Sequence, residues 1–184
     1  MLHAKKPAEV RADLEALLRL APQENLSLFN IDIDFFMMYF DVFGPEQETI
    51  ALNEVGSMLS ALDSINYQTL FAHHTNEADF KTYRNHFLAA SFGKKDPFEK
   101  GQEIKKALES LEIPIYDIKD SKYKPTERKA EDGRIVVIDP KKITVHMGTS
   151  RYAGYNPNVS DLMNLVMEAE EQSKAAESRI VILP

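Results

Sequence analysis

Two aspartates, Asp32 and Asp34, lie at the end of the first predicted strand, in the run Asn30-Ile31-Asp32-Ile33-Asp34. Side chains alternate along a strand, so the two carboxylates share one face. Ligands of parallel sheets bind beyond the carboxyl ends of the strands. Oxygen ligands suit Mg²⁺ or Mn²⁺, and the pair therefore predicts a metal site for phosphoryl chemistry. The pattern D-x-D is short, and the alternative is that one Asp caps the next helix while the other is solvated.

Further charged residues are candidates to complete such a site. Carboxylates that could join the pair follow later strands or open later helices: Glu77, Asp79, Asp139 and Asp161. Acidic residues in a first helical turn also favour the helix dipole, so each has a structural alternative. The predicted phosphate contacts are basic: Arg84, Lys94 and Lys95. Solvated surface lysines are the alternative interpretation.

Histidines offer a competing constellation. His73-His74-Thr75 and His146-Met147-Gly148-Thr149 end two predicted strands. The first run resembles the His-x-Thr motif of two-histidine phosphoesterases, whose histidines act as general acid and base. The second departs from it because an extra residue separates His146 from Thr149. The alternative is a pair of strand-end histidines bonded to nearby backbone.

Several chemistries are excluded by what the 184 residues lack. There is no phosphate loop, no G-x-G-x-x-G and no G-x-S-x-G elbow, and only seven glycines occur. The absence of cysteine removes thiol catalysis and thiolate metal sites. The net charge of -7 argues against a general affinity for nucleic acid. With no membrane-length apolar run and no signal peptide, the sequence predicts a cytoplasmic protein that does not bind membranes.

The elements that must position these residues follow from apolar spacing. Helices are predicted over 7–21, 35–43, 50–65, 77–92, 97–111 and 160–176. Strands are predicted over 26–34, 67–73, 113–118, 134–139, 142–147 and 179–183. This alternation predicts an α/β fold: a mainly parallel sheet of about five strands, with helices on both faces and one late β-hairpin. The chain is expected to form one domain, 1–184, with an N-terminal helix in 1–22 and a flexible loop at 119–133.

This order of elements resembles the 5′-nuclease, or PIN-like, domains. The resemblance is carried by three runs: residues 30–40 (NIDIDFFMMYF), 79–95 (DFKTYRNHFLAASFGKK) and 160–183 (SDLMNLVMEAEEQSKAAESRIVIL). In that family a strand ends in an acidic residue before an apolar helix, and a later acidic helix leads into a strand. The acidic cluster E-A-D-D of the family is reduced here to Ser160-Asp161. The resemblance implies a nuclease-like fold with a degenerate metal site, and it extends to Asp32, Asp34 and Asp161 as catalytic positions.

Two functional hypotheses follow. The first is a non-catalytic interaction or assembly subunit, nuclease-derived, because no catalytic motif is complete and the Met-rich run Phe35–Phe43 suits adaptable interfaces. Its expected partner is another protein or a second copy of the chain, with nucleic acid as an alternative. The second is a phosphoesterase or nuclease that depends on Mg²⁺ or Mn²⁺ at Asp32 and Asp34.

Overall fold

The computed structural model describes residues 4–20, 25–71, 86–152 and 158–183. Its helices are α1 (Pro7–Leu20), α2 (Phe36–Ala61), α3 (Pro97–Glu109) and α4 (Val159–Ser173). Its strands are β1 (Leu26–Ile33), β2 (Tyr67–Phe71), β3 (His86–Phe92), β4 (Thr126–Lys129), β5 (Ile135–Ile138), β6 (Val145–Tyr152) and β7 (Ile180–Leu183). Among these helices none is long and apolar enough to cross a membrane.

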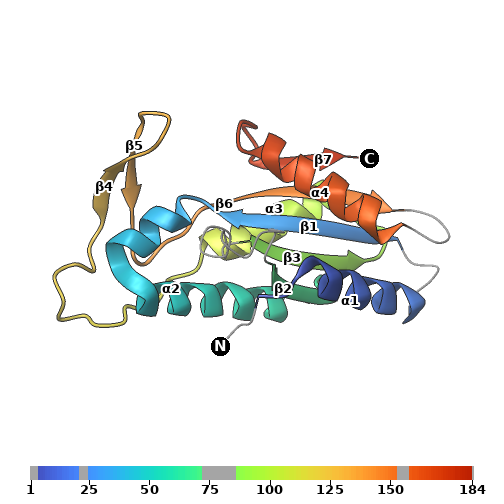
Figure 1. Ribbon diagram of the computed structural model, residues 1–184, viewed down its shortest axis with the longest axis horizontal. Helices are drawn as coiled ribbons and strands as arrows, with labels where there is room; N and C mark the ends of the chain where they lie inside the picture. Colours follow the sequence, from blue (N-terminus) through green and yellow to red (C-terminus); the bar gives the residue numbers. More distant parts are fainter. Residues whose placement is uncertain (1–3, 21–24, 72–85, 153–157, 184) are drawn as a thin grey trace.

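Five strands form the main sheet, in the order β2-β3-β1-β6-β7 (Figure 1). The pairs β1–β3, β1–β6 and β2–β3 are antiparallel, and β6–β7 is parallel. The prediction of a mainly parallel sheet is therefore wrong. The prediction failed because it required a strand at residues 113–118. These residues form no strand, so the strand–helix–strand crossovers that would make the sheet parallel do not exist there.

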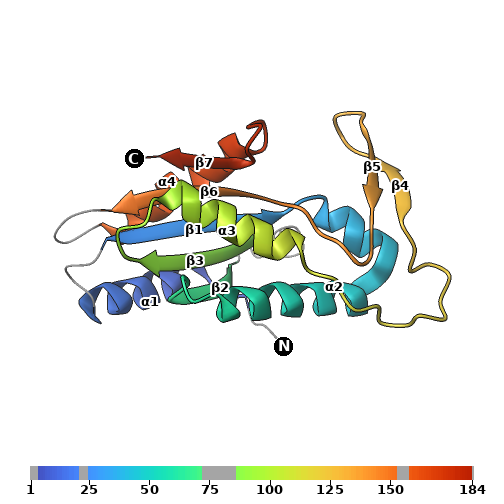
Figure 2. The same ribbon diagram turned by 180° about the vertical axis from the view of Figure 1, so that it is seen from behind.

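The central strand β1 separates two apolar cores, because all eight of its residues are buried and its side chains alternate. Phe29, Ile31 and Ile33 face the core formed with α2 and α3. Leu26 and Leu28 face the core formed with α1 and α4. In Figure 1, α4 and α1 lie in front of the sheet. In Figure 2, which shows the opposite side, α3 lies in front of it. By the same alternation, Asn30 and Asp32 lie on the face that α4 covers.

Local signals explain several helix boundaries. Asp96 caps α3 by accepting hydrogen bonds from the backbone N–H groups of Phe98 and Glu99, and Pro97 occupies the first turn. Helix α4 is capped by Asn158, whose side chain accepts a hydrogen bond from the Ser160 N–H. Element α2 consists of two helical stretches on either side of Gly44, whose φ of 84° and ψ of 176° are not helical, so two helices were correctly predicted around this residue.

A second, two-stranded sheet of β4 and β5 forms an arm, residues 126–138, that stands away from the main sheet in both views (Figures 1 and 2). The hairpin was predicted to pair residues 134–139 with 142–147, but β5 pairs with β4 instead. Strand β4 lies within residues 119–133, which were predicted to form a flexible loop. Residues 145–152 enter the main sheet beside β1 as β6. The sequence Thr126–Lys129 is polar, and only its pairing with β5 makes it a strand.

Candidate functional site

The carboxyl end of β1 gathers ionisable side chains from three strands and one helix. Asp32 is 9% exposed and pairs in register with His86 on β3 and with His146 on β6. Glu170 reaches the same point from α4 and is 1% exposed. One ligand atom from each of Asp32, His146 and Glu170 lies within 4.8 Å of the other two, and this group is called the acidic cluster below.

The imidazole of His146 lies at the centre of this arrangement. Its Nδ1 is 2.7 Å from Asp34 Oδ1 and its Nε2 is 2.7 Å from Glu170 Oε1. Its Nε2 is also 3.4 Å from Asp32 Oδ2. Burial alone would lower the pKa of His146, but hydrogen bonds to Asp34 and Glu170 outweigh burial and raise that pKa to about 9. Both ring nitrogens therefore donate to carboxylates, as expected for an imidazolium.

The carboxylates differ in protonation because their surroundings differ. Burial raises the pKa of Asp32, His146 opposes this rise and nearby Glu170 adds to it, and together they bring the pKa to about 7. Burial would also raise the pKa of Asp34, but hydrogen bonds from His146 and Thr144 and the charge of Arg179 lower it. Asp34 thus stays ionised at neutral pH, whereas Asp32 exchanges its proton near pH 7.

Helix α4 approaches the sheet closely enough for this contact because of Gly148 on β6. A Cβ at this position would lie 2.1 Å from the Glu170 backbone N and 2.4 Å from the Val166 carbonyl O. Only glycine allows the backbone of α4 to pack at this distance. The same glycine pairs in register with Asn30 of β1.

Asn30 is a further polar group on this face. It lies two residues before Asp32 and is 0% exposed. Among the residues that the structure describes, neither its Oδ1 nor its Nδ2 has a hydrogen-bond partner. A buried amide without partners is costly, and such groups mark places where a water, an ion or a ligand group completes the bonding.

The structure brings together some of the predicted site residues and separates others. Asp32 and Asp34 both lie at the end of β1, but Asp34 is engaged by His146, Thr144 and Arg179 and is not part of the acidic cluster. Asp161 is exposed and nine residues before Glu170, which is about 13 Å along α4. It lies toward the Leu26 end of β1, where Val159 and Leu162 pack.

The predicted phosphate contacts also lie elsewhere or cannot be placed. Lys94 and Lys95 are exposed just after β3, whose last residue Phe92 pairs with Leu26 at the opposite end of β1 from Asp32. Lys95 forms an ion pair with Glu103. Arg84, Glu77, Asp79 and the run His73-His74-Thr75 lie outside the described residues.

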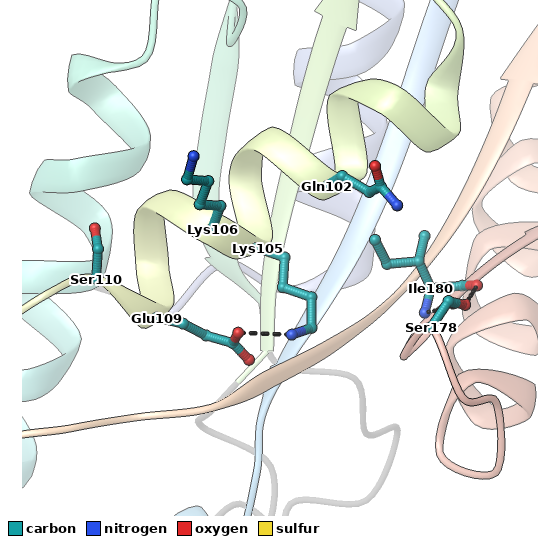
Figure 3. Close-up of a pocket in the computed structure, with 7 residues that line it drawn as sticks. All are labelled: Gln102, Lys105, Lys106, Glu109, Ser110, Ser178 and Ile180. Carbon is teal, nitrogen blue, oxygen red and sulfur yellow. Dashed lines mark hydrogen bonds and ion pairs between the residues drawn. The ribbon is translucent and has the colours of Figure 1, made fainter.

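A separate cavity of about 410 Å³ lies between α3 and the turn before β7 (Figure 3). Six of the seven residues that line it have polar side chains, although their aliphatic parts form much of the wall: Gln102, Lys105, Lys106, Glu109, Ser110, Ser178 and Ile180. The ammonium of Lys105 is paired with Glu109 at 2.6 Å, while Lys106 points away from both. The charge of Lys105 is thus neutralised within the cavity wall, and the acidic cluster remains the stronger candidate site.

Comparison with known proteins identifies solved structures that share this fold. No family model matches the sequence, and no curated protein matches it. Among solved structures, the active GGEEF domain of a diguanylate cyclase from Vibrio cholerae is 17% identical, with a TM-score of 0.59 over 96% of this chain and 93% of that one. The GGDEF domain of DgcB from Caulobacter crescentus, in complex with c-di-GMP, is 14% identical, with a TM-score of 0.63 over 98% and 89%. The fold is that of GGDEF domains.

This GGDEF-type fold corrects the hypotheses drawn from the sequence. The PIN-like resemblance is wrong. Both functional hypotheses are wrong as well: the nuclease-derived assembly subunit and the metal-dependent nuclease or phosphoesterase. The resemblance failed because β1 does end in acidic residues before the apolar start of α2, but within a sheet whose pairs at β1 are antiparallel. Complexes with proteins occur among the structural neighbours, since the diguanylate cyclase SiaD was solved with its activator SiaC.

The signals that sequence reasoning missed are local. Glu170 was overlooked because a glutamate in an amphipathic helix is usually solvated. It lies four residues after Val166 and three before Ser173, both buried, and therefore on the buried stripe of α4. An acidic residue at a stripe position is the signal that could have identified it.

Proposed function

We propose that this chain is a cyclase-type nucleotide domain, which binds the phosphate groups of a guanosine nucleotide at the carboxyl end of β1. The proposal rests on one observation above all: a fold shared with diguanylate cyclases carries a buried acidic cluster at the end of its central strand. The pentapeptides that name the neighbours, G-G-D-E-F and G-G-E-E-F, do not occur here, since the chain has no two adjacent glycines. The proposal therefore concerns nucleotide binding first and turnover second.

The donor set fits a divalent cation. Asp32 and Glu170 supply carboxylate oxygens, and His146 supplies its Nε2 once that nitrogen releases the proton it donates to Glu170; all three ligand atoms lie within 4.8 Å of one another. Mg²⁺ prefers oxygen ligands alone, whereas a mixed oxygen and nitrogen set suits Mn²⁺ or Zn²⁺. A cation held there supplies positive charge that neutralises nucleotide phosphates. The unpartnered amide of Asn30, next along the same face, is placed to bond a ligand group or a bound water.

The residues around the cluster have supporting tasks. Asp34 holds His146 by its Nδ1 and is itself held by Thr144 at 2.7 Å and by Arg179, which fixes the orientation of the ring. Lys174, 3.7 Å from Glu170, adds a cation at the rim, where it is about half exposed. Gly148 keeps α4, and with it Glu170, at the required distance from the sheet.

The test is binding of GTP by calorimetry with Mn²⁺, with Mg²⁺ and without a divalent ion. We expect Mn²⁺-dependent binding that Asp32→Asn weakens at least about tenfold, or about 1.4 kcal/mol. The matched control is Asp161→Asn, which removes a carboxylate at the far end of the sheet and should leave binding unchanged. Binding that is equal in Asp32→Asn and wild type, or no binding under any condition, contradicts the proposal. The same samples are assayed for c-di-GMP, whose accumulation would extend the proposal from binding to synthesis.

A further inference from the structure

The acidic cluster combines one nitrogen ligand with two carboxylates in a site that is almost closed to solvent. The side chains of Asp32, His146 and Glu170 are 13%, 4% and 1% exposed. Mg²⁺ takes oxygen ligands in an octahedral arrangement and gives up its waters reluctantly, so a dry site with a nitrogen donor suits it poorly. Zn²⁺ accepts nitrogen together with oxygen and needs only three or four ligands from the protein. The composition of the cluster therefore favours zinc over magnesium.

The spacing of the ligand atoms agrees with this choice. Ligands about 2.0–2.2 Å from a zinc ion lie about 3.4 Å apart at the corners of a tetrahedron. The Nε2 of His146 is 3.4 Å from Asp32 Oδ2, which matches this spacing. The same Nε2 is 2.7 Å from Glu170 Oε1, because it donates a hydrogen bond to that carboxylate. When an ion replaces the proton, the two groups must separate by about 0.7 Å, which a small rotation of the Glu170 side chain supplies.

The orientation of His146 is that of a metal-binding histidine. Its Nε2 faces the other two ligands, while its Nδ1 is 2.7 Å from Asp34 Oδ1 on the other side of the ring. Histidines that bind metals usually donate their second ring N–H to a carboxylate or a carbonyl, which fixes the ring and makes the free nitrogen a better donor. Asp34 is held in turn by the hydroxyl of Thr144, at 2.7 Å. Asp34 is therefore a positioning residue for a metal ligand.

A second and independent observation indicates a ligand at this place. The side chain of Asn30 lies two residues before Asp32 on the same face of β1 and is 0% exposed. Within the part of the chain that the structure describes, its Oδ1 and Nδ2 have no hydrogen-bond partner. A buried amide is seldom left in this state unless a water, an ion or a ligand group completes its bonds. A metal ion with its bound water, held beside Asp32, supplies such a partner.

We propose that the acidic cluster is a zinc site, with Asp32, His146 and Glu170 as ligands and a fourth position open to water or to a phosphate oxygen. The ligands come from β1, β6 and α4, so a bound ion joins α4 to the centre of the sheet. Mn²⁺ binds sites of nitrogen and oxygen less tightly than Zn²⁺ and is the weaker occupant. This inference rests on the site of the proposed function, but it goes further because zinc binds there in the absence of nucleotide.

The first experiment uses metal ions alone, without nucleotide. The full chain is stripped with a chelator, and Zn²⁺, Mn²⁺ and Mg²⁺ are each titrated into it by calorimetry. We expect Zn²⁺ to bind at least about 100-fold more tightly than Mg²⁺ and at least about 10-fold more tightly than Mn²⁺. Co²⁺ in the site should show the intense visible absorption of four-coordinate cobalt, which six-coordinate cobalt lacks. A chain that binds no Zn²⁺, or that binds Mg²⁺ as tightly, overturns the proposal.

Variants locate the ion within the chain. His146→Gln removes the nitrogen ligand and should weaken Zn²⁺ binding at least about 100-fold. Asp34→Asn removes only the carboxylate that orients the ring and should weaken it about 10- to 100-fold. The matched control is Asp161→Asn, which changes an exposed carboxylate of the same helix as Glu170 and should bind Zn²⁺ as wild type does. Glu170→Gln keeps the size of the side chain and serves as a second ligand variant, with circular dichroism to check that each variant is folded.

The outcomes separate this inference from the nucleotide function. Unchanged Zn²⁺ binding in a folded His146→Gln or Glu170→Gln variant would assign the zinc to other residues and refute the site. Zn²⁺ binding that both variants lose, in a chain that binds no GTP, supports the zinc site and contradicts the nucleotide proposal. GTP binding supported by Mg²⁺, in a chain that binds no Zn²⁺, contradicts the zinc site and leaves the nucleotide proposal standing.

Discussion

Protonation of His146 offers a quantitative test of the acidic cluster. Its side chain is 4% exposed and bonded to Asp34 and Glu170, and its pKa rises from an ordinary 6.5 to about 9. A basic group whose pKa is higher in the folded state holds its proton more tightly there than in the unfolded chain. The stabilisation is therefore complete below about pH 6.5 and is lost as the pH rises through 9.

The magnitude follows from the same numbers. One pKa unit corresponds to about 1.4 kcal/mol, so a rise from 6.5 to about 9 is worth about 3 kcal/mol of the free energy of unfolding. Asp32 complicates the measurement. Because its pKa is raised to about 7, the free energy of unfolding also falls as the pH rises from 3.8 to 7. Removal of His146 would move that second titration upward. We therefore place the comparison in an Asp32→Asn background, where the expected contribution of His146 is about 2 kcal/mol, since the Asp32 charge no longer assists.

The assay is urea unfolding of Asp32→Asn and of Asp32→Asn/His146→Gln at pH 7 and pH 9.5. The single variant should lose about 1 kcal/mol more over this interval than the double variant, because the unfolded histidine is already mostly deprotonated at pH 7 and the rest of its contribution is lost below that pH. NMR titration of the imidazole gives an independent value, with the His146 resonance identified by its absence in the double variant. Equal losses in the two proteins, or a measured pKa at or below 6.5, would refute the ion-pair geometry at the end of β1.

Three further predictions concern stability, each measured by urea unfolding against wild type. Gly148→Ala should cost more than about 3 kcal/mol because its Cβ meets the α4 backbone at 2.1 Å, while the control Gly101→Ala, whose Cβ meets a side-chain carbon at 3.3 Å, should change stability by less than about 1 kcal/mol. Asp96→Ala should cost about 1 kcal/mol through the loss of the α3 cap, and an unchanged midpoint would show that the cap is not formed. Gln47→Leu should cost about 2–4 kcal/mol because it leaves backbone groups at the base of the arm unpaired, and a neutral result would contradict this role.

Elements with their own local signals could be predicted from the sequence. Helix α3 has Asp96 as its cap and Pro97 in its first turn, and β1 and β7 are short apolar runs between polar residues. Strand β3 could not be predicted, because Phe87 and Leu88 continue a helical spacing that begins at Phe80. Its strand conformation comes from pairing with β1 and β2, which are distant in sequence.

The candidate site was predictable only in part, for a similar reason. Asp32 and Asp34 could be identified because they follow a buried strand. Their partners could not, since His146 and Glu170 reach Asp32 through the antiparallel register of β6 and the close packing of α4. A register is a property of two strands together, and Asp161 was included because of the PIN-like resemblance and not because of any strand pairing.

The close approach of α4 at Gly148 also bears on how this protein acquires its site. Asp32 and Glu170 are separated by 137 residues of intervening chain, and α4 leaves the ribosome after the other helices of the described residues. Contacts between such distant segments form slowly, because closing a long loop costs entropy before any contact repays it. During synthesis, the central strand and its aspartate exist while the acidic cluster does not. Docking of α4 onto Gly148 is thus a completion step: an unfinished or C-terminally truncated chain would have most of the fold but none of the assembled cluster.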